Sequence, residues 1–274
     1  MKFGISSFIT DQGIRPAPLG TALEERAFDS LFIAEHTHIP ADRRTPYPGG
    51  GELPDIYYRT LDPFVALTAV GVVTQRLLLG TGIALIPQRD PITTAKEVAS
   101  LDLVSGGRVI FGIGVGWNRE EMSNHGTDPS TRGRLTDERL LAMRELWTQE
   151  RAEFHGEFVN FDPVFAWPKP VQRPHPPIYV GGGEKAFPRV ARLGDAWLAN
   201  SVPAEELGPQ IERLRALANR DVPVTVYAVP GDPAQIEGYM RLGVERVLFY
   251  LPTLPEQETL EHLDRLADVA ARYH

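Results

Sequence analysis

The sequence contains no cysteine among its 274 residues. This absence excludes disulfides, thiolate metal ligands, iron–sulfur clusters and a cysteine nucleophile. No apolar run approaches the roughly 20 residues of a membrane-spanning helix, and residues 1–10 lack the apolar core of a signal peptide. Basic runs are also absent and the formal net charge is -8, which disfavours a nucleic-acid surface. We therefore expect a cytoplasmic protein with no membrane or nucleic-acid partner, whose chemistry depends on other side chains or on a cofactor.

Short apolar segments alternate with amphipathic ones along the whole chain. The expected strands cover residues 2–8, 29–34, 77–86, 108–116, 178–180, 195–199, 222–229 and 246–250. The expected helices cover residues 16–27, 61–73, 91–105, 132–148, 184–193, 204–217, 233–242 and 255–273. Such alternation is typical of a parallel sheet, and eight units favour a (β/α)8 TIM barrel over a doubly wound sheet. No linker divides the chain, so residues 1–274 are expected to form a single domain.

Two long segments interrupt this alternation. Residues 36–60, after the second strand, contain repeated prolines and glycines that exclude regular structure. Residues 151–176, before the fifth strand, place Phe154, Phe158 and Phe161 at the spacing of a short hairpin. Because the loops after the strands form the active face of such barrels, both segments are candidate walls of a substrate pocket.

Glycine recurs where several successive strands end, in residues 79–83, 112–116 and 181–183. Backbone without side chains lets a flat or anionic ligand approach the main chain. The spacing Gly112-x-Gly114-x-Gly116 is not the dinucleotide fingerprint, and packing in a crowded barrel layer is an alternative explanation for Gly112 and Gly114. The triplet 181–183 precedes a predicted helix and offers backbone amides to a phosphate or carboxylate. The pattern indicates one cofactor site built from strand ends.

Few side chains near the strand ends carry obvious chemistry. His36 and His38 form a His-x-His pair, but the later strand ends offer no histidine or aspartate to complete a metal site. His36 alone can exchange protons near neutral pH, or it caps a loop. Trp117 either walls the pocket or packs against a helix. The arginines that can neutralise an acidic ligand, or form surface salt bridges instead, are Arg43, Arg44, Arg59, Arg89 and Arg119.

Several motifs occur together in this chain. They are residues 79–83, Pro91 followed by residues 95–99, 101–102 and 105–108, residues 112–117, residues 167–172, and residues 176–177 before Gly181 and Gly182. In combination they resemble the luciferase-like monooxygenase superfamily, and within it the branch that uses the deazaflavin coenzyme F420. The resemblance extends along essentially the whole chain.

This resemblance implies a (β/α)8 TIM barrel of the bacterial-luciferase-like type with an insertion, assembled as a homodimer. It implies a cis peptide bond between Gly82 and Ile83 that backs the cofactor ring, and it places His36 beside the ring. The residues expected to bind the cofactor are Glu35, Gly82, Ile83, Gly114, Val115, Gly116, Trp117, Asn118, Gly181, Gly182 and Gly183. The last three are expected to receive its phosphate.

Two departures from the family pattern bear on the activity. Sugar-phosphate dehydrogenases of this group carry a glutamate near the place of Trp117 and a tryptophan near that of Pro40, which argues against that activity here. Flavin-using relatives often have a serine where this chain has Glu184. A carboxylate there would repel a terminal phosphate dianion, which favours F420 with its internal phosphodiester.

The sequence therefore predicts an F420-dependent oxidoreductase that transfers a hydride to or from a small organic substrate, with His36 supplying or accepting the proton. Three alternatives stay open. One is an FMN-dependent two-component monooxygenase served by a separate reductase. The others are a non-catalytic F420- or flavin-binding protein and a metal hydrolase.

Overall fold

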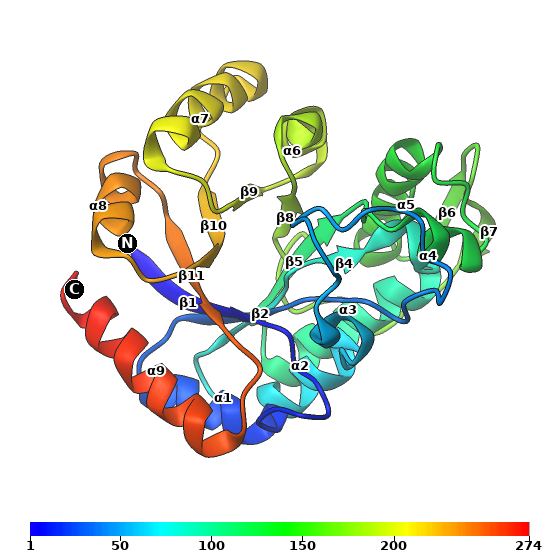
Figure 1. Cartoon of the computed structure of the whole chain (residues 1–274). Coiled ribbons are helices and arrows are strands. Elements are labelled where there is room, and N and C mark those ends of the chain that lie inside the picture. The colour runs from blue at the N-terminus through cyan, green and yellow to red at the C-terminus, as the bar shows by residue number, and fades with distance from the viewer. Residues whose placement is uncertain (274) are drawn as a thin grey trace.

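The computed structural model of the protein describes residues 1–273 and contains a closed parallel barrel. Figure 1 shows the strands at the centre and the helices around them. The strands are β1 (Lys2–Ser7), β2 (Ser30–Ile33), β3 (Leu78–Thr81), β4 (Ala84–Leu85), β5 (Val109–Gly114), β8 (Ile178–Gly181), β9 (Ala196–Asn200), β10 (Val224–Val229) and β11 (Arg246–Leu251). Pairing of β3 with β5 closes the sheet, and every pair in the barrel is parallel. Because β3 and β4 are successive pieces of one barrel strand, the predicted (β/α)8 barrel is confirmed.

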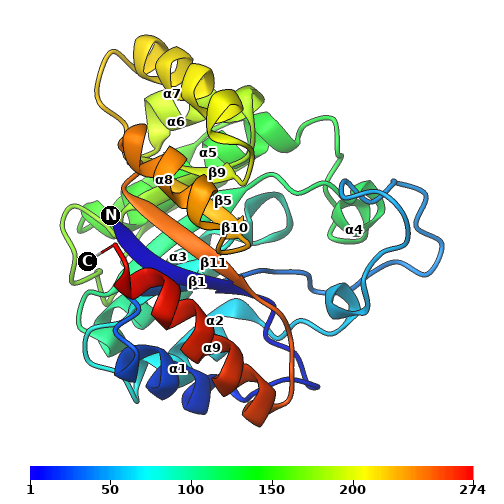
Figure 2. The same ribbon diagram turned by 60° about the vertical axis from the view of Figure 1, so that its left-hand side comes forward.

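The helices other than the short α4 cover the outside of the barrel, and the turned view in Figure 2 shows α4 apart from them, beside the loops. They are α1 (Pro16–Glu25), α2 (Pro63–Gly71), α3 (Pro91–Ser105), α4 (Arg119–Asn124), α5 (Arg132–Thr148), α6 (Phe187–Leu193), α7 (Ala204–Ala218), α8 (Pro233–Arg241) and α9 (Glu256–Ala271). No helix within residues 1–273 is long and apolar enough to cross a membrane.

Three of these helices begin with the same dipeptide. Asp62, Asp90 and Asp232 each precede a proline and accept hydrogen bonds from backbone N–H groups of the first turn of α2, α3 and α8. A carboxylate cap satisfies N–H groups that have no partner inside the helix, and proline at the first position loses no hydrogen bond. The predicted start of a helix at Asp90 is therefore confirmed.

Local breaks in the backbone differ from the sequence prediction at two places. The expected continuous strand at residues 77–86 is wrong, because the cis peptide bond between Gly82 and Ile83 separates β3 from β4 and a 3-10 turn, η2 (Ile86–Gln88), follows. The expected helix at residues 184–193 begins as the 3-10 turn η3 (Glu184–Ala186) before α6. The short helix α4 and the turn η1 (Asp55–Tyr58) were not predicted.

The segment before the fifth barrel strand contains the predicted hairpin. Strands β6 (Ala152–His155) and β7 (Asn160–Val164) pair antiparallel, with Phe154 opposite Phe161. The carboxylate of Glu138 on α5 accepts three backbone N–H groups of residues 157–159 at the hairpin turn. These contacts hold the hairpin against α5 on the outside of the barrel, and Figure 1 shows β6 and β7 beside that helix.

The interior of the barrel is filled near its amino-terminal end. Arg246 is 1% exposed and pairs with Asp29 at 2.9 Å, and its Nη1 also donates to the Tyr179 hydroxyl. Phe32 and Leu248 pack in the same inner cluster. This packing forms a floor, so the open space of the barrel lies at the carboxyl ends of the strands.

Candidate active site

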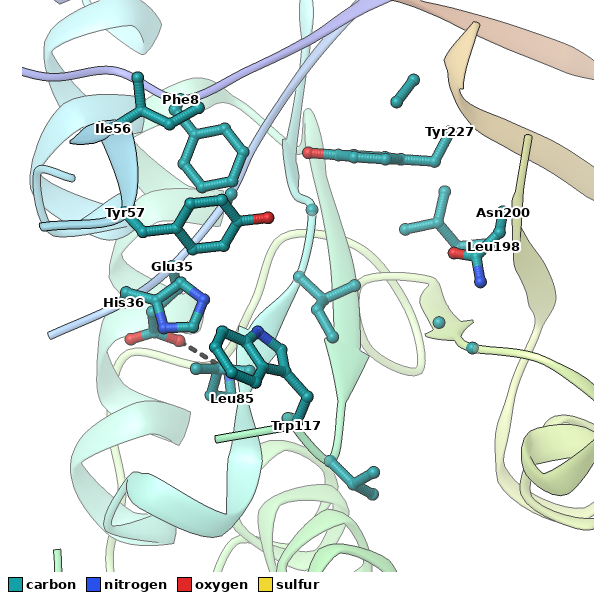
Figure 3. Close-up of a pocket in the computed structure, with 18 of the residues that line it drawn as sticks. Phe8, Glu35, His36, Ile56, Tyr57, Leu85, Trp117, Leu198, Asn200 and Tyr227 are labelled. Atoms are coloured by element: carbon teal, nitrogen blue, oxygen red, sulfur yellow. Dashed lines mark hydrogen bonds between the residues drawn. The ribbon is translucent and has the colours of Figure 1, made fainter. Parts of the chain in front are cut away.

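A cavity of about 590 Å³ lies at the carboxyl ends of the barrel strands. This volume falls in the range typical of small-molecule sites. In Figure 3, His36, Tyr57 and Trp117 stand on one side of the cavity, and Tyr227, Leu198 and Asn200 stand on the other. The predicted residues that line it are Glu35, His36, Gly82, Ile83, Val115, Gly116, Trp117, Gly181 and Gly182. Gly114, Asn118 and Gly183 are not among the lining residues, so their part in binding stays a prediction.

His36 is held from behind by a carboxylate. Its Nδ1 lies 2.8 Å from Oε2 of Glu121 on α4, and both side chains are buried. An imidazole whose Nδ1–H donates to a carboxylate keeps Nε2 as the nitrogen that can accept a proton. Within residues 1–273 no hydrogen-bond partner of Nε2 is found, and His36 lines the cavity. The pair can therefore exchange a proton with a bound ligand.

Asn118 explains how Glu121 reaches this place. Its side-chain oxygen caps α4 by accepting the N–H of Glu121 at 3.4 Å. The cap turns the first turn of the helix toward the end of β2, where His36 lies. Asn118 is 1% exposed, and its observed contact is this helix cap.

Glu35 precedes His36 but its carboxylate is already engaged. One oxygen accepts the backbone N–H of Leu85 at 2.6 Å, and the other accepts Nε of Arg89 at 2.7 Å. Arg89 also pairs with Asp62 and Glu97, at 2.9 and 2.8 Å. Burial alone would lower the pKa of Arg89, but the three carboxylates raise it. Of the two roles that the sequence left open for Arg89, the structure has the salt bridges, because its charge is used inside the protein.

The peptide between Gly82 and Ile83 is cis, as the family resemblance implied. The Ile83 side chain rests on two glycines from neighbouring strands. A Cβ atom at Gly114 would lie 1.9 Å from Cδ1 of Ile83, and one at Gly181 would lie 2.9 Å from its Cγ2. These glycines are required because Ile83 occupies the space where their side chains would be. Ile83 and Gly181 form an apolar floor of the cavity.

The glycine triplet continues this floor to the edge of the cavity. Gly182 has φ +121, a conformation that favours glycine, and its carbonyl accepts Nε1 of Trp197 at 2.7 Å. A Cβ at Gly183 would meet no atom within 4 Å, so the backbone here is open to a ligand. Glu184 pairs with Arg213 at 2.6 Å. The expected repulsion of a phosphate by Glu184 is thus weakened by a neighbouring cation.

Three aromatic rings close the His36 side of the cavity. Tyr57, Tyr47 and Trp117 have ring centroids 5.3 to 6.3 Å apart, and the Tyr57 ring lies 5.1 Å from that of His36. Tyr57 donates a hydrogen bond to Tyr47 at 3.3 Å. Burial and this neighbouring phenol raise the pKa of Tyr57, so its hydroxyl stays neutral. Trp117 walls the pocket, which decides between the two roles that the sequence left open.

The opposite wall comes from β9, β10 and β11 and was not predicted. A bulge in β10, where Ala228 has φ 59, lies next to Tyr227. A Cβ at Gly82 would lie 2.6 Å from the Tyr227 ring, so this ring covers the glycine of the cis peptide. Asn200 and Tyr250 also line the cavity. In the sequence, the one feature that marks these residues is their position at the ends of predicted strands. Ordinary surface residues occupy such positions too, so the feature does not single them out.

The two long segments differ in their relation to the cavity. Residues 36–60 contribute Tyr47, Pro54, Ile56 and Tyr57 to its lining, and in both Figures 1 and 2 they run beside α4. No residue of 151–176 lines the cavity. The expectation that this second segment walls the substrate pocket is wrong, because its hairpin packs on the outside of α5.

The remaining polar candidates lie at the surface. His38 contacts Thr37 and Asn124, away from His36. Arg59 pairs with Asp55 and Asp11. Across the described part of the chain, no three His, Cys, Asp or Glu side chains come together in a group that could hold a metal ion.

Comparison with known proteins identifies the family. The model of the family described as luciferase-like monooxygenase matches residues 14–232, and the chain therefore belongs to this family. An uncharacterized protein of Mycobacterium tuberculosis is 42% identical over 97% of this chain and 98% of its own length. An F420-dependent glucose-6-phosphate dehydrogenase of Nakamurella multipartita is 32% identical over 70% of this chain and 53% of its own length.

The relatives include enzymes named for either cofactor. An FMNH(2)-dependent dimethylsulfone monooxygenase of Pseudomonas putida is 34% identical over 47% of this chain and 36% of its own length. Among solved structures, a monooxygenase from Streptomyces bottropensis has a TM-score of 0.79 at 20% identity and covers 100% of both chains. An F420-dependent secondary alcohol dehydrogenase, solved with an F420-acetone adduct, has a TM-score of 0.74 at 18% identity over 98% of this chain and 99% of that one. At these identities the structural likeness shows the fold alone.

Proposed function

We propose that this protein is an F420-dependent oxidoreductase that transfers a hydride to or from a small organic substrate. The observation that carries the proposal is the buried pair of His36 and Glu121, with Nδ1 and Oε2 2.8 Å apart at the cavity wall. Carbonyl reduction and alcohol oxidation both require a group that gives or takes a proton at the substrate oxygen. Membership of the luciferase-like family supports an oxidoreductase or monooxygenase activity.

The residues around the cavity suit a flat redox ring. Ile83, Gly116 and Leu198 offer an apolar surface, and no side chain interrupts the floor at Gly181 and Gly182. Backbone amides at the triplet 181–183, just before η3, would receive a phosphate group. When bound here, a deazaflavin supplies the hydride chemistry that no side chain of this protein can supply. His36 then holds or accepts the accompanying proton at Nε2, and Glu121 fixes its orientation.

The choice of F420 over FMN rests on two supports. The F420-dependent relative aligns over 70% of this chain, whereas the FMNH(2)-dependent one aligns over 47%. A proton-transferring pair at the ring also suits hydride transfer between stable molecules. The second candidate is an FMN-dependent two-component monooxygenase served by a separate reductase. Membership of the luciferase-like family supports this activity as much as it supports the F420-dependent one.

A fluorescence titration separates these cofactors. We expect F420 to bind with a micromolar or lower dissociation constant, and FMN to bind at least about tenfold more weakly. Strong binding of FMN without binding of F420 would reject the proposal. Oxygen consumption with reduced flavin and a substrate would then support the monooxygenase.

The variant His36→Ala distinguishes an enzyme from a cofactor carrier. It should retain the affinity for F420 and lose activity by about 10²- to 10⁴-fold, the usual contribution of general acid–base catalysis. A cofactor-binding protein without catalysis would show no turnover with any tested alcohol or ketone, and the substitution would then have no activity to remove.

We further propose that the protein forms a homodimer through α2, α3 and the segment 165–171. Large apolar side chains are exposed on these elements, namely Val65, Val72, Ile92, Leu103, Val104, Phe165, Trp167 and Val171. Lys96 of α3 donates to the carbonyl of Trp167, which places the segment beside that helix. An apolar surface of this kind is typical of an interface between subunits.

A further inference from the structure

No free positive charge faces the cavity. Within residues 1–273, neither lysine nor arginine is among the lining residues. Arg89 lies behind Glu35 and already pairs with three carboxylates. The carboxylate of Glu121 is fully buried behind His36. Away from the backbone amides of residues 181–183, an anion in this space would meet no lysine or arginine side chain. The cost of removing its charge from water would therefore not be offset by an ion pair.

Arg43 is the cation that approaches the cavity wall from the loop side. Its guanidinium lies over the Trp117 ring, 5.5 Å from the centroid, and Nη1 donates to the carbonyl of Thr45. Arg43 itself is not among the residues that line the cavity. It packs on the aromatic wall and adds no cation to the interior.

Besides His36 and Glu35, whose carboxylate pairs with Arg89, the polar side chains that line the cavity are neutral phenols and one amide. Figure 3 shows the hydroxyls of Tyr57 and Tyr227 directed into the space from opposite walls, with Asn200 beyond Leu198. Burial raises the pKa of Tyr57, Tyr227 and Tyr250, so all three remain protonated at neutral pH. Phenol and amide groups bind carbonyl or hydroxyl oxygens. They compensate poorly for the cost of removing a full charge from water.

The rest of the wall is apolar. Phe8 lies next to Tyr57, with ring centroids 4.7 Å apart. Ile56 lines the same wall, and Leu198 lines the opposite one. Burial of apolar surface gains roughly 25 cal/mol per Å². The cavity thus favours a ligand with a hydrocarbon skeleton and one or two polar oxygens.

From these observations we infer that the site takes uncharged, mainly apolar ketones or alcohols and rejects carboxylate and phosphorylated substrates. The substrate oxygen is held between His36 and Tyr57, whose hydroxyl proton turns from Tyr47 to the substrate oxygen when the substrate binds. The inference rests on the proposed function for the cofactor, but it concerns the substrate wall alone. In the reducing direction the carbonyl carbon would gain a hydride, which reduced F420 would supply when bound and would thereby be oxidised. The carbonyl oxygen would gain the proton held at Nε2 of His36, so that the ketone becomes an alcohol.

A matched pair of probes tests the exclusion of charge. One is a cyclohexanone that carries a methyl ester, and the other is the same cyclohexanone with the free carboxylate. Each is titrated by calorimetry into the protein with and without bound F420, and each is offered as substrate with reduced F420. We expect the ester to bind at least about tenfold more tightly than the carboxylate and to be reduced. Equal binding, or preferential reduction of the carboxylate, would overturn the inference.

The same titrations keep the two proposals apart. Failure of F420 itself to bind would count against the proposed function. The two probes on the cofactor-free protein still measure the discrimination between ester and carboxylate, because the lining side chains are present in both forms. A protein that binds F420 and then reduces glucose 6-phosphate would keep the proposed function and reject this substrate class.

A single added charge tests the physical cause. Asn200 lies at the end of β9, is exposed toward the cavity and has a neutral side chain. The variant Asn200→Lys should narrow the preference for the ester by about tenfold, whereas Asn200→Gln should leave the preference unchanged. If Asn200→Lys kept the full preference while melting like the wild type, the lack of a cation would not be the reason for the exclusion.

The variant Tyr57→Phe tests the hydrogen bond to the substrate oxygen. It should weaken binding of the ester ketone roughly two- to tenfold, the usual effect of losing one neutral hydrogen bond. Binding of the matching cyclohexane ester, which has no ketone oxygen, should not change. Equal losses for both ligands would show that Tyr57 acts through shape alone, and the proposed oxygen site would be wrong.

Discussion

Glu121 lies directly behind His36, with Oε2 2.8 Å from the imidazole Nδ1, although the two residues are 85 positions apart in the sequence. The carboxylate is fully buried. It therefore accepts the Nδ1–H group of His36 and leaves Nε2 for the cavity. A proton on Nε2 would give a buried ion pair, which is more stable than a lone buried imidazolium.

The variant Glu121→Gln should lower kcat without changing the affinity for F420. The amide oxygen of glutamine can still accept the Nδ1–H group, but it carries no charge to stabilise a protonated ring. If Glu121 acts only through His36, its loss costs at most the 10²- to 10⁴-fold that general acid–base catalysis usually contributes. Single-turnover rates of F420 oxidation or reduction measure this directly.

The double variant of His36 and Glu121 provides the control. We expect it to be no slower than His36→Ala alone, because residues that act as a unit show non-additive effects. If the double variant were slower than His36→Ala by the factor that Glu121→Gln alone produces, Glu121 would contribute to the reaction independently of His36.

The glycines around Ile83 give a second prediction. Gly114→Ala would place Cβ 1.9 Å from Cδ1 of Ile83 and force this side chain into the cavity. Such overpacking costs about 1 to 3 kcal/mol of folding free energy, and the displaced side chain should also weaken F420 binding at least about tenfold. Denaturant unfolding and a fluorescence titration measure the two effects.

Gly183→Ala is the matched control for this change. A Cβ there meets no protein atom within 4 Å, so the stability should stay within about 0.5 kcal/mol of the wild type. If the backbone of residues 181–183 receives the cofactor phosphate, the added methyl group still weakens F420 binding. An unchanged affinity would place the phosphate elsewhere.

Local patterns in the sequence were sufficient for most of the fold. The Asp-Pro pair at Asp90 and the alternating Phe154 and Phe161 report on their own neighbours, and the structure has the cap and the hairpin there. The barrel followed from counting repeated units. Such features depend on residues that are close together in the chain, and a single sequence shows which residues these are.

The site was harder to predict because its contacts are distant. Glu121 reads as a surface residue of an irregular segment, and only the packing of α4 against the end of β2 brings it to His36. Tyr227 lies beside a bulge in β10 that no sequence pattern marks. His36, Trp117 and the glycines could be proposed from the sequence because their types and their places at strand ends suit a cofactor site, whereas a tyrosine or a glutamate has many other uses.

A pH-dependent contribution to stability is expected from Glu24 on α1. Burial works to raise its pKa, but hydrogen bonds from the backbone N–H groups of residues 75–77 outweigh burial and lower it below the ordinary 4.5. A carboxyl group with a lowered pKa in the folded state stabilises the protein above its unfolded pKa. That stabilisation is lost as the pH falls through the folded pKa.

The variant Glu24→Gln should therefore have a lower Tm than the wild type at pH 7, and the difference should shrink as the pH falls below about 4.5. Glu25→Gln is the control, because Glu25 is exposed on the same helix. A Tm difference that stays constant from neutral to acid pH would show that charge is not the cause.

The proposed homodimer predicts an effect of charge on α2. Val65 is 69% exposed on this helix, and Val65→Glu should shift the protein from dimer to monomer in light scattering after gel filtration. Leu217→Glu is the control, since Leu217 is 55% exposed on α7, which lies on the opposite side of the barrel in Figure 1. Dissociation by Leu217→Glu alone would place the interface on α7.

Arg89 joins the segment after β2 to α2 and α3 through ion pairs. Its removal should lower the free energy of unfolding and disturb the residues beside the cavity. Its side chain is 11% exposed, and the guanidinium pairs with Glu35, Asp62 and Glu97. Arg89→Met fills the same space but leaves these carboxylates without a counter-charge, and breaking a buried ion pair costs about 3 to 5 kcal/mol. Since Glu35 also holds the N–H of Leu85 beside the Gly82–Ile83 peptide, we expect weaker F420 binding together with the loss of stability.

Arg59→Met is the control, because its ion pairs are exposed and should contribute little. Urea unfolding compares the two variants, and an equal, small loss in both would show that the carboxylates around Arg89 relax toward solvent.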